Sequence, residues 1–390
     1  MTTRVLAVFG TRPEAIKMAP VVLRLRRDAR FETRVCVTAQ HREMLDSVLE
    51  LFAIPPHHDL AVMSPGQDLS DVTSRVLLGM RGVLKSERPD IVLVHGDTTT
   101  CLASAFAAFY AGIPVGHVEA GLRTGDLRAP FPEEANRVLT DRIASEFYAP
   151  TDRARRNLIG EGVADESIHV TGNTGIDALL WVRERIAARS PASYARQLGP
   201  EVVALLEHWC GPIVLVTGHR RESFGRGFDE LCGAIRDAAR AHPDWLFVYP
   251  VHLNPNVQAP ARAILGQSAN VVLTAPLEYE PFVWLMNRSD VLLTDSGGLQ
   301  EEGPALGKPV LVMREVTERP EALEAGAVKL VGTNRARIIG ALEELLLDRE
   351  RYEAMAHARN PFGDGHAAER IAGALHARFQ GGELGLAASA

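Results

Sequence analysis

Short apolar runs alternate along the first half of the chain with longer stretches in which apolar residues recur at helical spacing. The runs predict buried strands, and the stretches between them predict amphipathic helices. This alternation is typical of an α/β fold with mainly parallel sheets. The predicted strands are Val5–Phe9, Arg34–Thr38, Ile91–Val94 and Pro114–Val118, and the predicted helices are Pro13–Arg27, Leu69–Lys85 and Thr100–Ala111.

The second half of the chain repeats the plan, so the pattern predicts two Rossmann-like doubly wound domains facing a cleft. A charged helical segment followed by Ser-Pro and Gly-Pro punctuation places the crossing between them near Ile176–Pro200. We expect an N-terminal domain over 1–180, a C-terminal domain over 181–365, and a helix packing back with a frayed tail over 366–390. The predicted strands are Ile213–Thr217, Trp245–Pro250, Val271–Thr274, Val291–Thr294 and Pro309–Met313, and the helices are Phe228–Ala241, Glu280–Met286, Leu299–Leu306 and Ala336–Leu347.

Composition and charge exclude several classes of protein. The chain has 390 residues, 46% of them hydrophobic, and a net charge of −7, which argues against a protein that wraps nucleic acid. Four scattered cysteines without a CxxC pair fit a reducing compartment. The chain shows no signal-peptide pattern and no apolar run of about 18 residues, so we expect a cytoplasmic protein that does not enter the membrane. Thirteen histidines without HxxxH or HExxH spacing, and the lack of a GxGxxG fingerprint, predict neither a metal nor a dinucleotide cofactor.

Two loops at predicted strand ends suit an anionic ligand. In the first, the backbone amides after Phe9 are expected to point at an anion, with positive charge added by Arg12 and Lys17. An ordinary capped turn with solvated basic side chains is the alternative. The second loop has the sequence Ser296-Gly297-Gly298, where two glycines allow close approach to the backbone and the serine can cap the next helix or donate to phosphate.

Acidic residues mark the same region. Glu301 and Glu302 in the first turn of the following helix either accept hydrogen bonds from sugar hydroxyls or cap the helix. Asp97 follows a buried strand and is either a helix N-cap or a catalytic group. Glu119 ends another strand and is either catalytic or paired with Arg123.

Glu133 and its neighbour Glu134 open a helix, where acidic residues are ordinary but can also serve catalysis. His219 follows the first strand of the second half beside Arg220, which suits phosphate binding or acid/base work, and His252 is a similar, weaker candidate. Together, the carboxylates and histidine at strand ends and the two anion-binding loops predict a nucleotide-sugar cleft that carries acid/base chemistry.

These motifs together resemble the non-hydrolysing UDP-N-acetylglucosamine 2-epimerases of bacteria, in order from about Val5 to Asp364. The resemblance implies the GT-B type of two-domain fold, a C-terminal UDP-binding domain, a homodimer, and interconversion of UDP-GlcNAc and UDP-ManNAc without metal or nicotinamide. The motifs are GTRPEAIKMAP, TAQHREML, VHGDTTT, GHVEAGLRT, PEEANR, TGNT, TGHRRESFGRG, YPVHLNPNV, TDSGGLQEE, GKPVLVMR and TERPE.

The resemblance also implies a reaction in which UDP is eliminated across C1–C2 to give 2-acetamidoglucal and is then added back, with the proton delivered to the other face. Such a reaction needs a base, an acid and a firm hold on the departing diphosphate. The catalytic candidates that the resemblance implies are Asp97, Glu119, Glu133 and His219. The residues implied to hold UDP are Arg12, Lys17, Phe282, Ser296, Gly297, Gly298, Glu302 and Arg319.

A second UDP-GlcNAc site, which activates bacterial members, is implied at or near Gln40, Glu43, Glu133, Arg220 and His252. Glu43 stands where some members have Gln, and Leu277 stands where some have a polar residue that contacts uracil. Three alternatives remain open: a GT-B glycosyltransferase, a hydrolysing epimerase and a UDP-sugar sensor without chemistry. A full carboxylate set argues against the first and third, and the lack of a fused kinase domain argues against the second.

Overall fold

The computed structural model describes residues 2–39, 42–64, 66–218, 220, 225–317 and 319–381. Their contacts divide the chain into two compact units, Met1–Ala178 with Phe362–Ala390 (unit 1) and Leu179–Pro361 (unit 2). The change from one unit to the other falls inside helix α7 (Thr174–Ala187). The domain limits expected from the sequence remain a prediction, which limited proteolysis would test, and the expected frayed tail at 382–390 lies outside the described residues.

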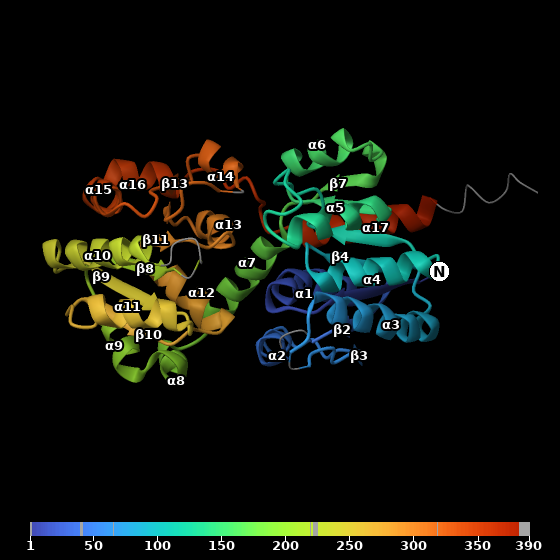
Figure 1. The fold of residues 1–390 in the computed structure, drawn as a ribbon, viewed down its shortest axis with the longest axis horizontal. Coiled ribbons are helices and arrows are strands. Elements are labelled where there is room, and N and C mark those ends of the chain that lie inside the picture. The colour runs from blue at the N-terminus through green and yellow to red at the C-terminus, as the bar shows by residue number, and fades with distance from the viewer. Residues whose placement is uncertain are drawn as a thin grey trace, which may run out of the picture. The chain divides into compact units, whose positions relative to one another are not determined.

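Unit 1 is built on a seven-stranded parallel sheet with the order β3-β2-β1-β4-β5-β6-β7. The chain returns at its end to this unit, where α17 (Ala367–Gly381) packs against α1; Figure 1 shows this helix in red. The strands are β1 (Thr3–Phe9), β2 (Phe31–Val37), β3 (His58–Asp59), β4 (Ile91–His95), β5 (Val115–Val118), β6 (Glu146–Ala149) and β7 (Ile168–Val170). The helices that precede α7 are α1 (Arg12–Arg26), α2 (Arg42–Leu51), α3 (Leu69–Glu87), α4 (Thr99–Tyr110), α5 (Glu133–Ile143) and α6 (Asp152–Gly160).

Unit 2 repeats the arrangement with a six-stranded parallel sheet of order β10-β9-β8-β11-β12-β13. The strands are β8 (Ile213–Thr217), β9 (Leu246–Pro250), β10 (Val271–Thr274), β11 (Val291–Thr294), β12 (Val310–Val312) and β13 (Val328–Leu330). The helices after α7 are α8 (Ala195–Leu198), α9 (Pro200–His208), α10 (Arg226–Ala241), α11 (Pro255–Leu265), α12 (Tyr279–Arg288), α13 (Leu299–Ala305), α14 (Pro320–Glu324), α15 (Arg335–Leu347) and α16 (Arg349–Ala356).

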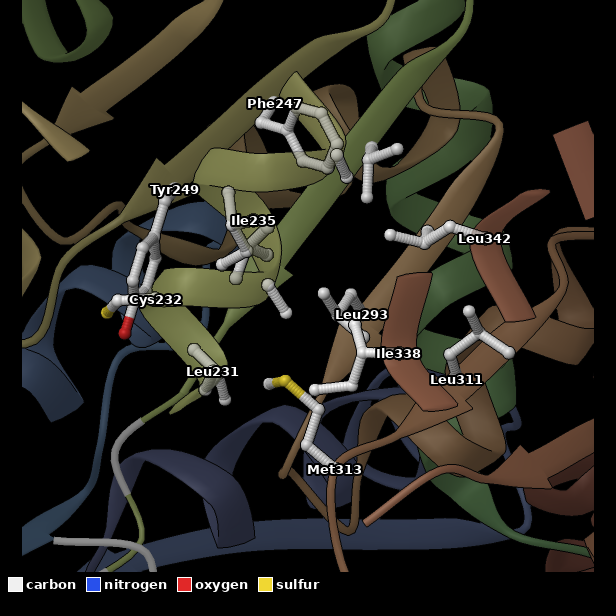
Figure 2. Close-up of a cluster of buried hydrophobic side chains, with 14 of the residues drawn as sticks. Leu231, Cys232, Ile235, Phe247, Tyr249, Leu293, Leu311, Met313, Ile338 and Leu342 are labelled. Carbon is white, nitrogen blue, oxygen red and sulfur yellow. The ribbon is translucent and has the colours of Figure 1, made fainter. Parts of the chain in front are cut away.

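The apolar runs form these strands because strands of a parallel sheet are covered on both faces and bury nearly every side chain. Val214 and its neighbours in β8 are fully buried, for example, and α10 and α15 pack together over the sheet. Figure 2 shows side chains of these two helices meeting Phe247 and Leu293 of the sheet. In the same cluster the Tyr249 hydroxyl donates a 2.7 Å hydrogen bond to the carbonyl of Gly218, which ties the core to the loop after β8.

In both sheets the strand order reverses beside the first strand of the unit, between β1 and β4 and between β8 and β11. Open α/β sheets bind ligands beyond the carboxyl ends of the strands at such a switch point. The two doubly wound α/β domains expected from the sequence are therefore confirmed. Among the helices that the structure describes, none is long and apolar enough to cross a membrane.

Candidate active site

The turn after β4 carries Asp97 at the switch point of unit 1. Gly96 adopts a positive φ of 67°, which glycine allows without strain, and turns the chain away from the strand. Thr98, not Asp97, caps α4, since its side chain accepts a 3.0 Å hydrogen bond from the amide of Cys101. Of the two alternatives for Asp97, the N-cap is therefore wrong, and its carboxylate has other partners.

Those partners come from α5. Arg137 donates to the carboxylate of Asp97 from Nε at 3.1 Å and from Nη2 at 2.7 Å. The side chain of Asn136 donates to the backbone carbonyl of Asp97 at 2.8 Å. Arg137 is itself anchored at 2.8 Å to Glu134, whose side chain is almost completely buried. Asp97 is thus held by two hydrogen bonds from Arg137, and Glu134 fixes the position of this arginine.

Glu119 leaves β5 in a left-handed conformation, with φ of 68°. Such a backbone is uncommon for residues other than glycine and persists where the surrounding structure holds it. The carboxylate pairs with the ammonium of Lys17 and accepts a 2.9 Å hydrogen bond from the amide of Asn173. The expected pairing of Glu119 with Arg123 is wrong, because Arg123 instead donates to Asp141 at 2.7 Å.

The structure brings Asp97 and Glu119 to neighbouring strand ends. Strand β4 pairs with β5 in parallel, with His95 opposite Val118. A Cβ atom added to Gly96 would lie 3.9 Å from Oε1 of Glu119, so this carboxylate lies against the turn that presents Asp97. Two candidate acid/base groups therefore share one edge of the sheet.

The two acidic residues that open α5 have different surroundings. Glu134 is 1% exposed and accepts hydrogen bonds from the amides of Thr124 at 2.8 Å and Gly125 at 3.0 Å, as well as from Arg137. Glu133, the first residue of α5, is half-buried, and its carboxylate has no hydrogen bond or ion pair with another described residue. Glu134 therefore stabilises the loop, while Glu133 has acceptor capacity to offer a ligand.

A buried charge cluster lies beneath these turns. The Nδ1 of His117 lies 2.6 Å from a carboxylate oxygen of Asp141, and its Nε2 lies 2.8 Å from the carbonyl oxygen of Gly96. Both ring nitrogens face acceptors, so the imidazole is doubly protonated. Burial opposes the charge, but Asp141 raises the pKa of His117 well above its ordinary value. The other carboxylate oxygen of Asp141 accepts from the amide of Gly121 at 3.2 Å, so one cluster fixes the turns after both β4 and β5.

The turn after β1 is organised by Glu14. The amides of Gly10 and Thr11 donate to one of its oxygens at 3.0 and 2.8 Å, and the hydroxyl of Thr98 donates to the other at 2.7 Å. Burial raises the pKa of Glu14 to about 7, although these hydrogen bonds act in the opposite direction. The expectation that the amides of this turn point at an anion is therefore wrong for these two, which Glu14 already occupies.

Positive charge at this turn comes from α1. Arg12 is the first residue of the helix and is half-buried, and Lys17 lies further along it. A Cβ atom at Gly175 would lie 3.5 Å from Cε of Lys17, so the lysine stem runs against the start of α7 on its way to Glu119. Lys17 thus brings positive charge to a candidate catalytic carboxylate at the switch point of unit 1.

In unit 2 the loop after β11 presents Ser296, Gly297 and Gly298. Gly298 is the N-cap of α13 and no side chain caps that helix, so the expected capping role of Ser296 is wrong. A Cβ atom at Gly297 would lie 2.7 Å from Nη1 of Arg319, so the guanidinium packs directly against this glycine. Arg319 is held there by a 2.5 Å bond from Nε to Glu301. The buried Glu301 therefore orients the arginine.

Glu302 has a different partner. The hydroxyl of Tyr279 donates to its carboxylate at 3.0 Å. Phe282 lies one helical turn further along α12 and is half-buried, whereas Leu277, which precedes this helix, is 6% exposed. The loop after β11 and the first turn of α12 thus share a polar contact.

Two of the candidates for an activator site can be described. The amide of Arg220 donates to Asp295 at 2.7 Å, directly beside the loop after β11. His252 is exposed after β9, and its Nδ1 accepts from the amide of Asn254 at 3.1 Å. His219 and Gln40 lie outside the described residues, and Glu43 lies in α2 with its side chain outside them.

Sequence reasoning did not single out His95, the last residue of β4. Its side chain is 4% exposed, and neither ring nitrogen has a hydrogen-bond partner among the described residues. Its Nε2 lies 3.8 Å from Oε2 of Glu119, and burial lowers its pKa to about 4. A histidine within an otherwise apolar strand was the available signal: His95 is the last residue of β4, and His117 lies inside β5. Nowhere in the described ranges do three His, Cys, Asp or Glu side chains gather as a metal site would require.

Comparisons with known proteins agree with this geometry. A family model described as UDP-N-acetylglucosamine 2-epimerase matches residues 23–376. The Escherichia coli K12 protein called UDP-N-acetylglucosamine 2-epimerase is 58% identical over 375 residues, which cover 95% of this chain and 98% of the relative. The Campylobacter jejuni protein of the same name is 50% identical over 375 residues, which cover 95% and 97%.

Solved structures extend the similarity to the fold. The crystal structure of UDP-GlcNAc 2-epimerase from Neisseria meningitidis bound to UDP-GlcNAc matches with 47% identity and a TM-score of 0.88, covering 96% of this chain and all of that one. The Methanocaldococcus jannaschii enzyme in complex with UDP-GlcNAc and UDP matches with 32% identity and a TM-score of 0.78 over 96% and 100% of the two chains. The GT-B type of Rossmann-like domains expected from the sequence is confirmed by these matches.

Proposed function

The chain belongs to the UDP-N-acetylglucosamine 2-epimerase family and is an isomerase, and we propose that it interconverts UDP-GlcNAc and UDP-ManNAc by inverting C2. The observation that carries this proposal is the pair of carboxylates, Asp97 and Glu119, on neighbouring strand ends at the switch point of unit 1. Acid/base chemistry at a sugar carbon needs such groups within reach of one another.

The proposed route is elimination followed by re-addition. The C2 proton of the substrate is not adjacent to a carbonyl, so its direct removal would need a base far stronger than a side chain. When UDP leaves C1 as C2 loses its proton, the electron pair of the C2–H bond forms the C1–C2 double bond of 2-acetamidoglucal. UDP then adds back to C1 while a proton reaches C2 from the opposite face, so atoms and charge balance over the cycle.

Three carboxylates are proposed for the proton transfers: Asp97, Glu119 and Glu133. Their surroundings support the assignment in different ways. Asp97 and Glu119 each have a cationic partner, and Glu133 keeps its acceptor capacity for a ligand. His219 is proposed to act near the diphosphate.

Binding of UDP is assigned to both units. In unit 1, Arg12 and Lys17 supply the positive charge that a leaving diphosphate requires. In unit 2, Arg319 packed on Gly297 provides a planar guanidinium beside a backbone that a ligand can approach closely. The remaining groups assigned to UDP are Ser296, Gly298, Glu302 and Phe282, the last of them flanking the uracil.

Proton NMR in D2O tests the proposed function. UDP-GlcNAc incubated with the protein should give UDP-ManNAc, with deuterium at C2 in both epimers, because the C2 proton exchanges with solvent during each elimination. Release of free ManNAc with UDP would identify a hydrolysing enzyme instead. Substrate that stays unchanged at millimolar concentration would refute the epimerase proposal and point to transfer or sensing.

Activation by a second UDP-GlcNAc is proposed at Gln40, Glu43, Arg220 and His252, with Glu133 as a further member of the set that the resemblance implies. The exposed position of His252 supports it, since a regulatory ligand must reach the group from solvent. Initial rates measured from UDP-ManNAc alone should rise when traces of UDP-GlcNAc are added. A rate that stays proportional to enzyme and unaffected by UDP-GlcNAc would exclude such a site.

We also propose that the enzyme acts in the cytoplasm as a homodimer and supplies ManNAc for cell-surface polysaccharide. The outer face of α3 and α4 is a candidate for the dimer contact. Leu78, Phe109 and Tyr110 are 57%, 55% and 71% exposed there, beside a groove of about 670 Å³ between the two helices. Single soluble chains seldom leave so many large apolar side chains together in water.

A further inference from the structure

His95 combines two properties that rarely occur together. Its imidazole is 4% exposed at the end of β4, and both ring nitrogens lack hydrogen-bond partners among the described residues. Buried polar groups are nearly always paired, and each exception calls for a physical reason. Here the nearest acceptor is a candidate catalytic carboxylate, since Nε2 lies 3.8 Å from Oε2 of Glu119.

That separation is slightly too long for a hydrogen bond. An N–H donor normally lies about 2.9 Å from its oxygen, so a shift of roughly 1 Å would complete the contact. In this structure the ammonium of Lys17 and the amide of Asn173 occupy the carboxylate. The charged or titratable groups around His95 are Glu119 at the end of β5, Lys17 on α1, Asp97 on its own turn and His117 on β5.

The ring nitrogens of His95 are closed to solvent, so a bound sugar cannot touch them and any effect of His95 must pass through a neighbour. Its low pKa, which burial causes, leaves the ring neutral, with one N–H to donate and no charge to neutralise a carboxylate. A neutral donor stabilises the charged form of a carboxylate less than an ammonium does, so it holds the base and leaves it more basic than the ion pair does.

Movement of Lys17 would allow the hydrogen bond between His95 and Glu119 to form. Under the proposed function, on which this inference rests, the diphosphate of the substrate draws the Lys17 ammonium toward itself. Glu119, whose side chain is 10% exposed, then loses the positive charge of Lys17, and weaker compensation of a nearly buried carboxylate is costly. We propose that His95 is a positioning residue that donates a hydrogen bond to Glu119 once substrate has drawn Lys17 away.

The exchange changes what Glu119 can do. Paired with an ammonium, the carboxylate is a weak base, because the cation stabilises its charged form strongly. Held by His95 and Asn173, both neutral, it keeps its orientation and regains basicity. Glu119 thus becomes an effective base only when the diphosphate is in place, which limits proton abstraction to the occupied site.

His95→Leu and His95→Gln test the inference through kinetics. The leucine variant should lose roughly 10- to 100-fold in kcat, the effect of one hydrogen bond to a charged group, while its dissociation constant for UDP stays within about twofold. The acidic limb of its kcat profile should move to higher pH by about one unit, because the ionised carboxylate has lost a donor. His95→Gln restores an N–H and should recover most of the rate and the original limb.

Tyr148→Phe is the matched control. Tyr148 is fully buried on β6 of the same sheet, and its hydroxyl also has no hydrogen-bond partner among the described residues. Removal of the Tyr148 hydroxyl should leave kcat and the pH profile of kcat unchanged. A purely structural role for His95 would lower the melting temperature of both His95 variants without moving the pH limb, and that result would overturn the inference.

A crystal structure of the wild-type protein with UDP needs no variant. Lys17 should then contact the diphosphate, and Nε2 of His95 should lie about 3 Å from Glu119. Lys17 still on Glu119, with His95 as distant as before, would refute the exchange. The two proposals can fail separately: absence of epimerisation by the wild-type protein refutes the function, whereas normal turnover by His95→Leu refutes only the role of His95.

Discussion

Glu14 gives a quantitative prediction about stability, because its carboxyl is 2% exposed and accepts hydrogen bonds from neutral donors on Gly10, Thr11 and Thr98. Burial raises its pKa from 4.5 to about 7. Each pKa unit corresponds to about 1.4 kcal/mol of preference for the protonated form, so the shift is worth about 3 kcal/mol. We expect Glu14→Gln to remove this dependence, because the amide is neutral at every pH.

Proton binding by Glu14 determines whether stability rises or falls with pH. Between pH 4.5 and pH 7 the folded protein holds the Glu14 proton more tightly than the unfolded chain does, so raising the pH favours unfolding. The contribution of Glu14 is therefore fully present below pH 4.5 and is lost as the pH rises through 7. Relative to wild type, Glu14→Gln should gain about 3 kcal/mol in free energy of unfolding between pH 4.5 and pH 8.

Urea unfolding at several pH values, followed by far-UV circular dichroism, measures the difference between the two proteins. Tryptophan fluorescence adds a second probe, which reports on unit 2 because Trp181, Trp209, Trp245 and Trp284 all lie there. Glu50→Gln, at an exposed position of α2, is the control and should run parallel to wild type. Parallel curves for Glu14→Gln as well would show that Glu14 ionises as it does in water, and would refute the reasoning.

Three further predictions concern chemistry, ligand binding and assembly. Asp97→Asn should lower kcat by roughly two orders of magnitude while the calorimetric affinity for UDP is kept, and near-normal turnover would remove Asp97 from the acid/base set. Gly297→Ala should weaken UDP binding about tenfold, because the guanidinium of Arg319 would lie 2.7 Å from the new Cβ. Gly340→Ala is the control, since its Cβ would meet nothing within 4 Å. Equal affinities of the two variants would contradict the assignment of Gly297 to the UDP site. Tyr110→Glu on the exposed face of α4 should give a monomer in light scattering and Leu347→Glu should not; a persisting dimer would place the interface elsewhere.

Strands with long apolar runs could be predicted from the sequence nearly to the residue. Val291–Thr294 and Ile213–Thr217 agree with the structure at both ends, since burial on both faces leaves a continuous apolar run. Three other elements were not predicted from the sequence, each for a physical reason. β3 has two residues, β6 begins with the charged Glu146, and Pro260 interrupts the periodicity of α11. The change from unit 1 to unit 2 falls inside α7, within the segment Ile176–Pro200 that the sequence indicated for the crossing.

The candidate carboxylates could be found because acidic residues stand out at the ends of apolar strands. Their partners could not, because pairing depends on contacts between distant segments. Arg123 is near Glu119 in sequence but pairs with Asp141, while Glu119 reaches back to Lys17, 102 positions earlier. Proximity in sequence is a poor guide where the backbone turns into a left-handed conformation, as it does at Glu119.

The two strand-end carboxylates differ in how firmly their cations are held, and this difference suits them to different parts of one reaction. Arg137, the partner of Asp97, is anchored by a second carboxylate, Glu134, within α5 and is assigned to no ligand. Lys17, the partner of Glu119, is also the cation proposed for the diphosphate, so we expect its ion pair to be exchangeable. Under that proposal one carboxylate keeps its surroundings when substrate binds, while the other changes them. If the reaction proceeds by release and recapture of UDP, this asymmetry is useful, because the pair of Lys17 and Glu119 would re-form whenever the diphosphate leaves the site.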